Sequence, residues 1–198
     1  MDFFPSFKEF NKKIKSRESQ IVYTKFSADL DTPVSLMLKL AKNLKNSFLL
    51  ESVTGGEIKG RYSVIGMKPD LIWKCNLRWS EINKNALENS NNFIKQKEPP
   101  IESLKALIKE CYINIPDNLP AMSAGLFGYL SYEMINFVKN VSNLSKINLE
   151  LPQSVLFRPS IIVIIDNVKG EIIVINPIWF NSHNIDKIPV KEIYENSK

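Results

Sequence analysis

Four side chains that can carry charge or exchange hydrogen bonds surround one glycine turn in the first third of the chain. Glu51 and Ser52 end an apolar run, Gly55–Gly56 makes the turn, and Lys59 and Arg61 precede a second apolar run. A protein that buries a free amino acid must offer acceptors to its ammonium and donors to its carboxylate. Glu51 can meet the ammonium, and Ser52 can donate or accept. Arg61, or else Lys59, can meet the carboxylate, and the glycines let the backbone approach a small ligand.

The same residues have a simpler interpretation. Glu51 or Glu57 could form a cross-strand ion pair with Arg61 on an exposed hairpin. Such surface pairs contribute only about 0–1 kcal/mol and have no function of their own. The residue chemistry permits an amino-acid site but, taken alone, favours the exposed hairpin.

The elements that would position these residues follow from the spacing of the apolar residues. β-Branched and aromatic runs predict strands, and apolar residues at helical spacing predict helices. Strands are expected over 21–28, 47–53, 62–67 and 71–75, the last after a break at Pro69, and a hairpin over 160–178. Helices are expected over 6–19, 31–46 and 101–112 and at the C-terminal tail, and the segment 124–138 is expected to start as a strand and end in a short helix. The polar stretch 80–100 is expected to be a surface connection.

The helix over 31–46 has the clearest start signal. Asp31 or Thr32 can cap it, and Pro33 suits its first turn. The residues expected on its packing face are Val34, Met37, Leu38, Ala41 and Leu44.

Hairpins and short connections indicate antiparallel pairing. The expected fold class is α+β, with a mainly antiparallel sheet or sandwich and helices packed on its outer face. We find no repeat and no interdomain linker, so residues 1–198 are interpreted as a single domain.

The composition excludes several classes of protein. The net charge is +5, but the lysines are spread along the chain, which argues against a nucleic-acid surface. Cys75 and Cys111 lie far apart and His183 is the single histidine, so a disulfide framework, a metal site or a Cys/His catalytic pair is not expected. No signal peptide is recognised, and the run at 161–165 is too short to cross a membrane, so a cytoplasmic protein is expected.

Two glycines, Gly125 and Gly128, lie in the segment "SAGLFGYLSYE". Their spacing does not fit a dinucleotide-binding loop, and no Lys-Ser/Thr pair follows as in a phosphate loop. Glycine within a strand permits a bulge or the close approach of another backbone, so we interpret both as structural.

Several segments together resemble anthranilate synthase component I. These are "FLLESVTGGEIKGRYSVIG", "LPAMSAGLFGYLSYEMI", "RPSIIVIIDNVKGEIIVI" and the helix "DTPVSLMLKLAKN", in the order of that family. The resemblance covers nearly the whole chain. The first segment separates this family moderately well from its relative, para-aminobenzoate synthase component I. Ser131 stands where the family has a glycine.

The resemblance implies a particular division of labour. The N-terminal part of the family carries feedback inhibition by tryptophan, and a C-terminal part binds chorismate and Mg²⁺ and performs the lyase reaction. The segment that completes the tryptophan pocket, and the catalytic and metal-binding residues, belong to that later part and are not found here. No cofactor and no catalytic residue are therefore expected in this chain. The implied partners are tryptophan, the chorismate-binding catalytic domain and a glutamine amidotransferase subunit.

The resemblance implies roles only for residues at positions that match the motifs of the family. Ser52 matches a serine that contacts tryptophan in the family, with Glu51 beside it. Lys59 and Arg61 lie where the family has a basic residue near the ligand, and either of them could be that residue. The leading hypothesis is thus a part of a feedback-regulated enzyme that contributes half of the tryptophan site. The alternatives are a scaffold fragment that binds no ligand and packs on a catalytic partner, or the equivalent part of para-aminobenzoate synthase component I.

Overall fold

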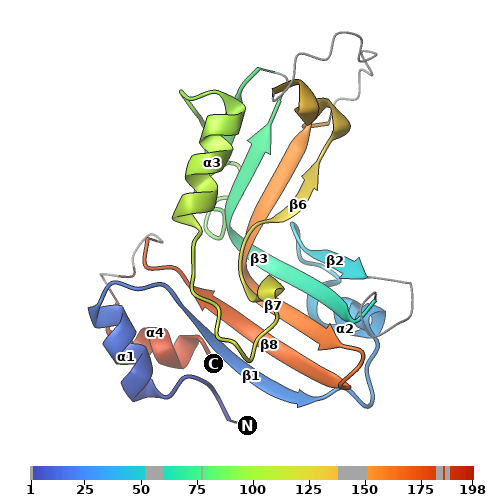
Figure 1. The fold of residues 1–198 in the computed structure, drawn as a ribbon, viewed down its shortest axis with the longest axis vertical. Helices are drawn as coiled ribbons and strands as arrows, with labels where there is room; N and C mark the ends of the chain where they lie inside the picture. Colours follow the sequence, from blue (N-terminus) through green and yellow to red (C-terminus); the bar gives the residue numbers. More distant parts are fainter. Residues whose placement is uncertain (1, 52–59, 77, 138–150, 182–184, 186–187) are drawn as a thin grey trace. The chain divides into compact units, whose positions relative to one another are not determined.

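The computed structural model describes residues 2–51, 60–76, 78–137, 151–181, 185 and 188–198. The chain divides into two compact units. One comprises Met1–Pro69, Ile113–Gly125 and Pro159–Lys198, and the other comprises Asp70–Tyr112 and Leu126–Arg158. Strands β3 (Tyr62–Cys75) and β7 (Ser154–Asp166) each pass from one unit into the other (Figure 1).

The first unit is built on one β-sheet. Its order is β1 (Gln20–Ser27), β8 (Glu171–Ile178), the last half of β7, the first half of β3, and β2 (Phe48–Glu51). The β1–β8, β7–β8 and β2–β3 pairs are antiparallel. The predicted hairpin over 160–178 is confirmed as β7 and β8.

Three helices cover the same face of this sheet. Helix α2 (Pro33–Ala41) packs Leu36 and Ala41 on Ile172 of β8 and on neighbours in β3 and β7. Helices α1 (Phe7–Lys15) and α4 (Val190–Asn196) pack on Val22 of β1. Val22 lies on the same side of the sheet as Ile172, because Phe26 pairs with Ile172 and side chains alternate along a strand. The expected α+β class with helices on one outer face is confirmed.

Local capping signals explain where two of these helices begin. The Ser6 hydroxyl accepts from the Glu9 backbone N–H, and the Glu9 carboxylate accepts from the Ser6 N–H. Thr32 caps α2 in the same reciprocal way with Ser35, and Pro33 occupies the first turn. Of the two predicted caps for α2, Thr32 is therefore correct.

The packing face predicted for α2 is partly wrong. Ala41 is buried, and Met37 and Leu44 are partly buried against the core, but Val34 is 50% exposed and Leu38 56% exposed. The helix instead buries Leu36. The segment carries apolar residues on more than one side, so the spacing alone admits two faces.

The second unit pairs the last half of β3 with β4 (Ser80–Asn83), and β4 with β5 (Ile94–Lys95). The first half of β7 pairs with β6 (Phe127–Leu130). Helix α3 (Pro100–Glu110) contributes buried Leu104 and Leu107, and its Ser103 hydroxyl accepts a 3.1 Å hydrogen bond from the Trp73 indole. Short 3₁₀ turns lie over Ala121–Ser123, in the first unit, and over Tyr132–Phe137.

Two expectations about strands need correction. The stretch 80–100 is not only a connection, because residues 80–83 form β4 and residues 94–95 form β5. Strand β3 also continues through Pro69, where a break was expected. The proline does mark a change, since it is the residue at which the chain passes from one unit to the other, and Lys68 before it has a positive φ of 51°.

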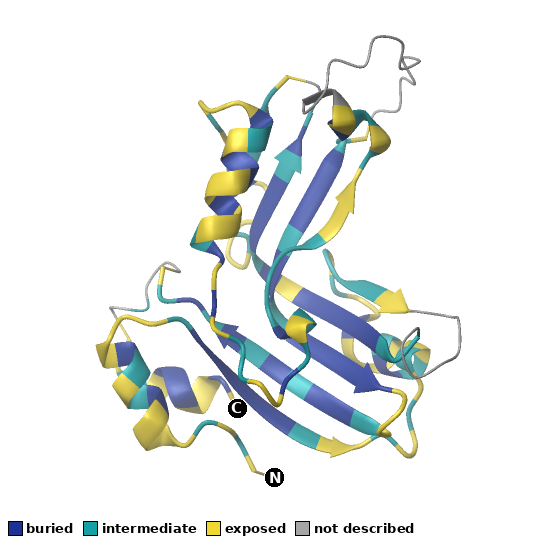
Figure 2. Cartoon of the chain, viewed as in Figure 1, coloured by how far each residue is buried: buried dark blue, intermediate teal, exposed yellow. Residues whose placement is uncertain are grey.

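Most buried strand residues lie in β1, β3, β7 and β8, whereas β2, β5 and β6 are largely exposed or half-buried (Figure 2). None of the helices in the described part of the chain is long and apolar enough to cross a membrane.

Candidate functional site

The predicted site residues fall at the open end of the β2–β3 pair. Glu51 is the last residue of β2, is exposed, and lies opposite Ser63 in the strand register. Arg61 directly precedes β3. Ser52 and Lys59, and with them the Gly55–Gly56 turn, lie outside the described residues.

Arg61 forms an ion pair with a residue that the sequence analysis did not single out. Its Nε donates to the two carboxylate oxygens of Asp166 at 3.0 and 3.2 Å, and its Nη2 donates to Oδ2 at 2.8 Å. The Asp166 side chain is only 3% exposed, and that of Arg61 31%. Within the described residues, Arg61 therefore pairs with Asp166 and not with Glu51, so the ion pair predicted for the exposed hairpin is wrong for Glu51.

Further hydrogen bonds hold the turn after β7 beside Arg61. Asp166 Oδ1 accepts from the backbone N–H groups of Val168 at 3.1 Å and Lys169 at 3.2 Å. The Asn167 N–H donates to the carbonyl of Arg61 at 2.8 Å, and its side-chain amide donates to the carbonyl of Gly60 at 3.2 Å. The Arg61 guanidinium also lies 4.9 Å from the ring of Tyr62.

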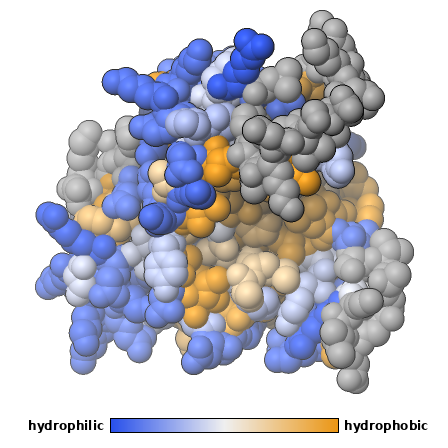
Figure 3. Space-filling model, turned by 45° about the horizontal axis from the view of Figure 1, so that its top comes forward, coloured by the Kyte–Doolittle hydropathy of each residue, from blue (hydrophilic) through white to orange (hydrophobic). Residues whose placement is uncertain are grey.

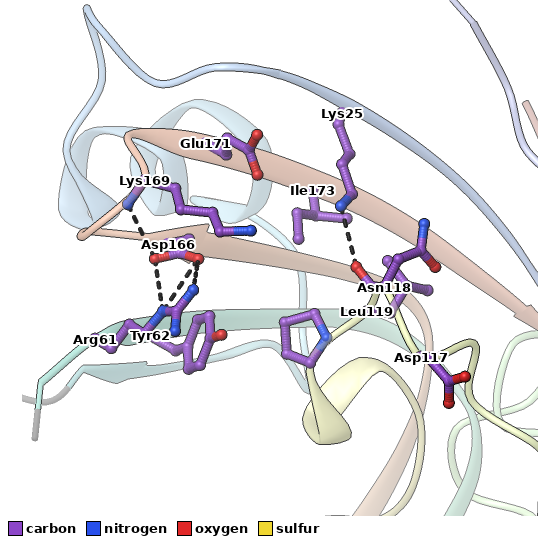
Figure 4. Close-up of a pocket in the computed structure, with 11 residues that line it drawn as sticks. Lys25, Arg61, Tyr62, Asp117, Asn118, Leu119, Asp166, Lys169, Glu171 and Ile173 are labelled. Carbon is purple, nitrogen blue, oxygen red and sulfur yellow. Dashed lines mark hydrogen bonds and ion pairs between the residues drawn. The ribbon is translucent and has the colours of Figure 1, made fainter. Parts of the chain in front are cut away.

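These residues form one side of a cavity of about 220 Å³ within the first unit (Figure 4). The opposite side is the loop that carries Asn118 and Leu119. Lys25 of β1 joins the loop to the sheet, because its Nζ donates to the Asn118 carbonyl at 3.1 Å. The remaining charged side chains of the lining are Asp117, Lys169 and Glu171.

The cavity is suited to binding polar groups and shows no catalytic arrangement. Its cations and carboxylates are equal in number, and the most buried carboxylate is already neutralised by Arg61. Over the described ranges, no group of three or more His, Cys, Asp or Glu side chains could hold a metal ion.

The pKa of Asp166 gives the pair a defined pH dependence. Burial acts to raise this pKa, but the hydrogen bonds from Arg61 and from the Lys169 and Val168 amides outweigh burial and hold it below its ordinary value. A carboxyl group whose pKa is lowered on folding stabilises the protein above its unfolded pKa, about 4. That stabilisation is lost as the pH falls through the folded pKa.

We therefore expect acid to destabilise the wild-type protein through this group. The measurement is the urea midpoint between pH 2 and pH 7. Asp166→Asn should have a lower urea midpoint than wild type at pH 7. Its midpoint should fall less than that of wild type as the pH drops below 4. Glu102→Gln, a change to an exposed carboxylate on α3, serves as the control. Parallel pH profiles for wild type and Asp166→Asn would contradict the expectation.

A sequence signal for Asp166 did exist. Asp166-Asn167 directly follows the run "IIVII" and precedes Gly170, and acidic and amide side chains at such a position commonly accept backbone hydrogen bonds within a turn. No signal of this kind indicated Lys25 or Tyr62, which reach the cavity through strand pairing and chain order.

The comparisons with known proteins agree on one family name. The chain is 51% identical over 177 residues to anthranilate synthase component 1 of Cereibacter sphaeroides, covering 89% of this chain and 35% of that protein. It is 30% identical over 193 residues to the protein of the same name from Acetivibrio thermocellus, covering 96% and 37%. The chain thus spans about a third of the length of the curated relatives it matches. No model of a known protein family matches it.

A solved structure agrees in fold. The crystal structure of anthranilate synthase component I from Streptococcus pneumoniae TIGR4 matches with a TM-score of 0.51 at 16% identity, over 86% of this chain and 36% of that one. The resemblance inferred from the sequence motifs is confirmed, and the match is to the N-terminal part of these proteins.

Proposed function

From the premise that the chain corresponds to the N-terminal part of anthranilate synthase component I, we propose that it is the regulatory part of such an enzyme and contributes half of a tryptophan feedback site. The observation that carries the proposal is the 51% identity over 89% of the chain to a protein of that name. The longer protein would convert chorismate and glutamine to anthranilate and pyruvate, with a glutamine amidotransferase subunit supplying ammonia. Tryptophan would act by binding one arrangement of the enzyme better than another.

The exposed apolar residues support a role as part of a larger assembly. In the first unit, α2 leaves Val34 and Leu38 about half exposed, and in the second unit β6 exposes Tyr129 and Leu130 by 44% and 56%. Figure 3 shows hydrophobic residues exposed at the surface among hydrophilic ones. Large exposed apolar areas are typical of interaction surfaces.

A second candidate rests on the same surfaces. The chain could serve as a scaffold that binds no ligand and packs on a chorismate-binding partner, since the relatives extend well beyond the matched region. The equivalent part of para-aminobenzoate synthase component I is supported less, because the relatives reported above carry the anthranilate synthase name.

Calorimetric titration of the chain with tryptophan separates these candidates. A regulatory part should bind with a Kd tighter than about 1 mM, equivalent to about −4 kcal/mol. Ser52→Ala and Glu51→Lys should each weaken binding, by about tenfold or more, because they remove groups expected to meet the charged end of the ligand. Glu102→Lys, a change to an exposed glutamate on α3, is the matched control and should leave the Kd unchanged.

Two results would count against tryptophan binding at this place. One is equal affinity in wild type, Ser52→Ala and Glu51→Lys. The other is absence of binding by wild type together with stable association with the separately produced remainder of a relative, which would favour the scaffold.

A further inference from the structure

Arg61 was one of two basic residues considered for the carboxylate of the effector, and its contacts point to another role. We propose that Arg61 and Asp166 form a positioning pair that fixes the start of β3 against the β7–β8 turn, and that Arg61 does not bind the effector carboxylate. The effector part of this statement rests on the proposed function. The positioning part rests on contacts alone.

The first argument is that Arg61 already has a carboxylate partner. Asp166 accepts from the Nε and Nη2 edge of the guanidinium in the two-pronged geometry that gives the strongest arginine–carboxylate pairs. An effector carboxylate at the other edge of the Arg61 guanidinium would lie close to the negative charge of Asp166. No further arginine would offset that repulsion. The charge of Arg61 is therefore committed within the protein.

The second argument is that Asp166 cannot easily turn to another cation. Its Oδ1 accepts from two backbone N–H groups of the turn as well as from Arg61. Lys25 and Lys169 line the same cavity, but the 3.1 Å hydrogen bond of Lys25 is to the Asn118 carbonyl. A carboxylate with this many fixed donors, and only 3% exposed, holds its position.

The third argument is that the backbone on either side of the pair is joined directly. Asn167 donates from its N–H to the Arg61 carbonyl and from its side chain to the Gly60 carbonyl. These bonds place the residues that enter β3 in contact with the turn that leaves β7. Glu51 lies opposite Ser63, two residues further along β3, so a shift of Arg61 would be transmitted to the end of β2 where the predicted ligand contacts begin.

The test compares Arg61→Gln, Arg61→Lys, Asp166→Asn and the double variant Arg61→Gln/Asp166→Asn in tryptophan titrations of the whole chain. If Arg61 positions, Asp166→Asn should weaken binding about as much as Arg61→Gln, and the double variant should be no worse than either. Arg61→Lys should bind as weakly as Arg61→Gln, because a lysine ammonium cannot form the two parallel hydrogen bonds that the guanidinium makes to a carboxylate. Glu102→Gln, a change to an exposed carboxylate on α3, is the control and should bind as wild type does.

The opposite pattern would overturn the proposal. If Arg61 bound the carboxylate itself, Asp166→Asn would leave affinity unchanged or improve it by freeing the guanidinium, and Arg61→Lys would retain part of the binding. Either result would contradict the positioning role but not the proposed tryptophan site.

A stability measurement keeps the proposal testable if wild type binds no tryptophan, the result that would remove the proposed function. In urea unfolding of wild type, Arg61→Gln, Asp166→Asn and the double variant, the effects of the two substitutions on the unfolding equilibrium should be coupled by roughly tenfold, because residues in direct contact do not act additively. Amide exchange at Asn167 and Val168 should also accelerate in Arg61→Gln. Additive effects on unfolding, with unchanged exchange, would show that the two residues do not act together.

Discussion

Arg158→Met is expected to lower the free energy of unfolding by about 3–5 kcal/mol, the cost of removing one partner of a buried ion pair. In the second unit Arg158 Nε and Nη2 donate to the two carboxylate oxygens of Asp70 at 2.8 and 2.7 Å. The side chains are 3% and 14% exposed. Methionine would fill much of the volume of arginine and would leave the Asp70 carboxylate without its cation. Urea denaturation at pH 7 measures the loss.

The double variant Arg158→Met/Asp70→Leu is the control for this prediction. Replacing both partners by apolar side chains removes the unpaired charge, so much of the stability should return. The Cys111 thiol lies 3.6 Å from Arg158 Nη1. Burial raises the pKa of this thiol, so it is expected to stay protonated at neutral pH in every variant. A single variant within about 1 kcal/mol of wild type, or a double variant no better than the single, would contradict the prediction.

Local patterns in the sequence predicted the elements that depend on neighbouring residues. The capped start of α2 at Thr32 and Pro33 is correct because a cap needs contacts only three residues away. The β7–β8 hairpin is correct for the same reason, since two β-branched runs and a short turn specify it. The fold class followed from these elements.

The ion pairs could not be predicted because their members lie far apart in the chain. Arg61 and Asp166 are separated by 105 positions, and Arg158 and Asp70 by 88. Asp166 ends β7 and Asp70 lies within β3, and nothing in the neighbouring sequence identifies the cation of either. The sequence singled out Arg61 and Glu51 but not Asp166. Of the two carboxylates considered as partners of Arg61, Glu51 is not its partner and Glu57 lies outside the described residues.

The α2 face shows a different limit. Val34 and Leu38 are spaced four apart, as a buried pair would be, and yet both are half exposed. Exposed apolar residues of this kind are typical of interaction surfaces. Helical periodicity identifies a face that packs but not whether the partner belongs to the same segment.

Gly128→Ala is expected to destabilise the second unit by about 3 kcal/mol or more, because backbone strain adds to a clash that no side-chain movement can relieve. A Cβ added at Gly128 would lie 1.9 Å from the carbonyl oxygen of Val155 and 2.9 Å from its carbonyl carbon. Gly128 also has a φ of +154°, which residues with side chains rarely adopt. The close approach of β6 to β7 is thus what the glycine permits, as its place in a predicted strand indicated. Thermal or urea unfolding measures the effect.

Gly125→Ala separates the clash from the backbone conformation. Gly125 has a comparable φ of +136°, but a Cβ there would meet nothing within 4 Å. Its substitution should therefore cost only the conformational strain, about 1–3 kcal/mol. If the two alanine variants proved equally stable, the steric account of Gly128 would fail. A larger loss at Gly128 would instead show that the approach of the Val155 carbonyl, and not the dihedral angle alone, requires glycine in this strand.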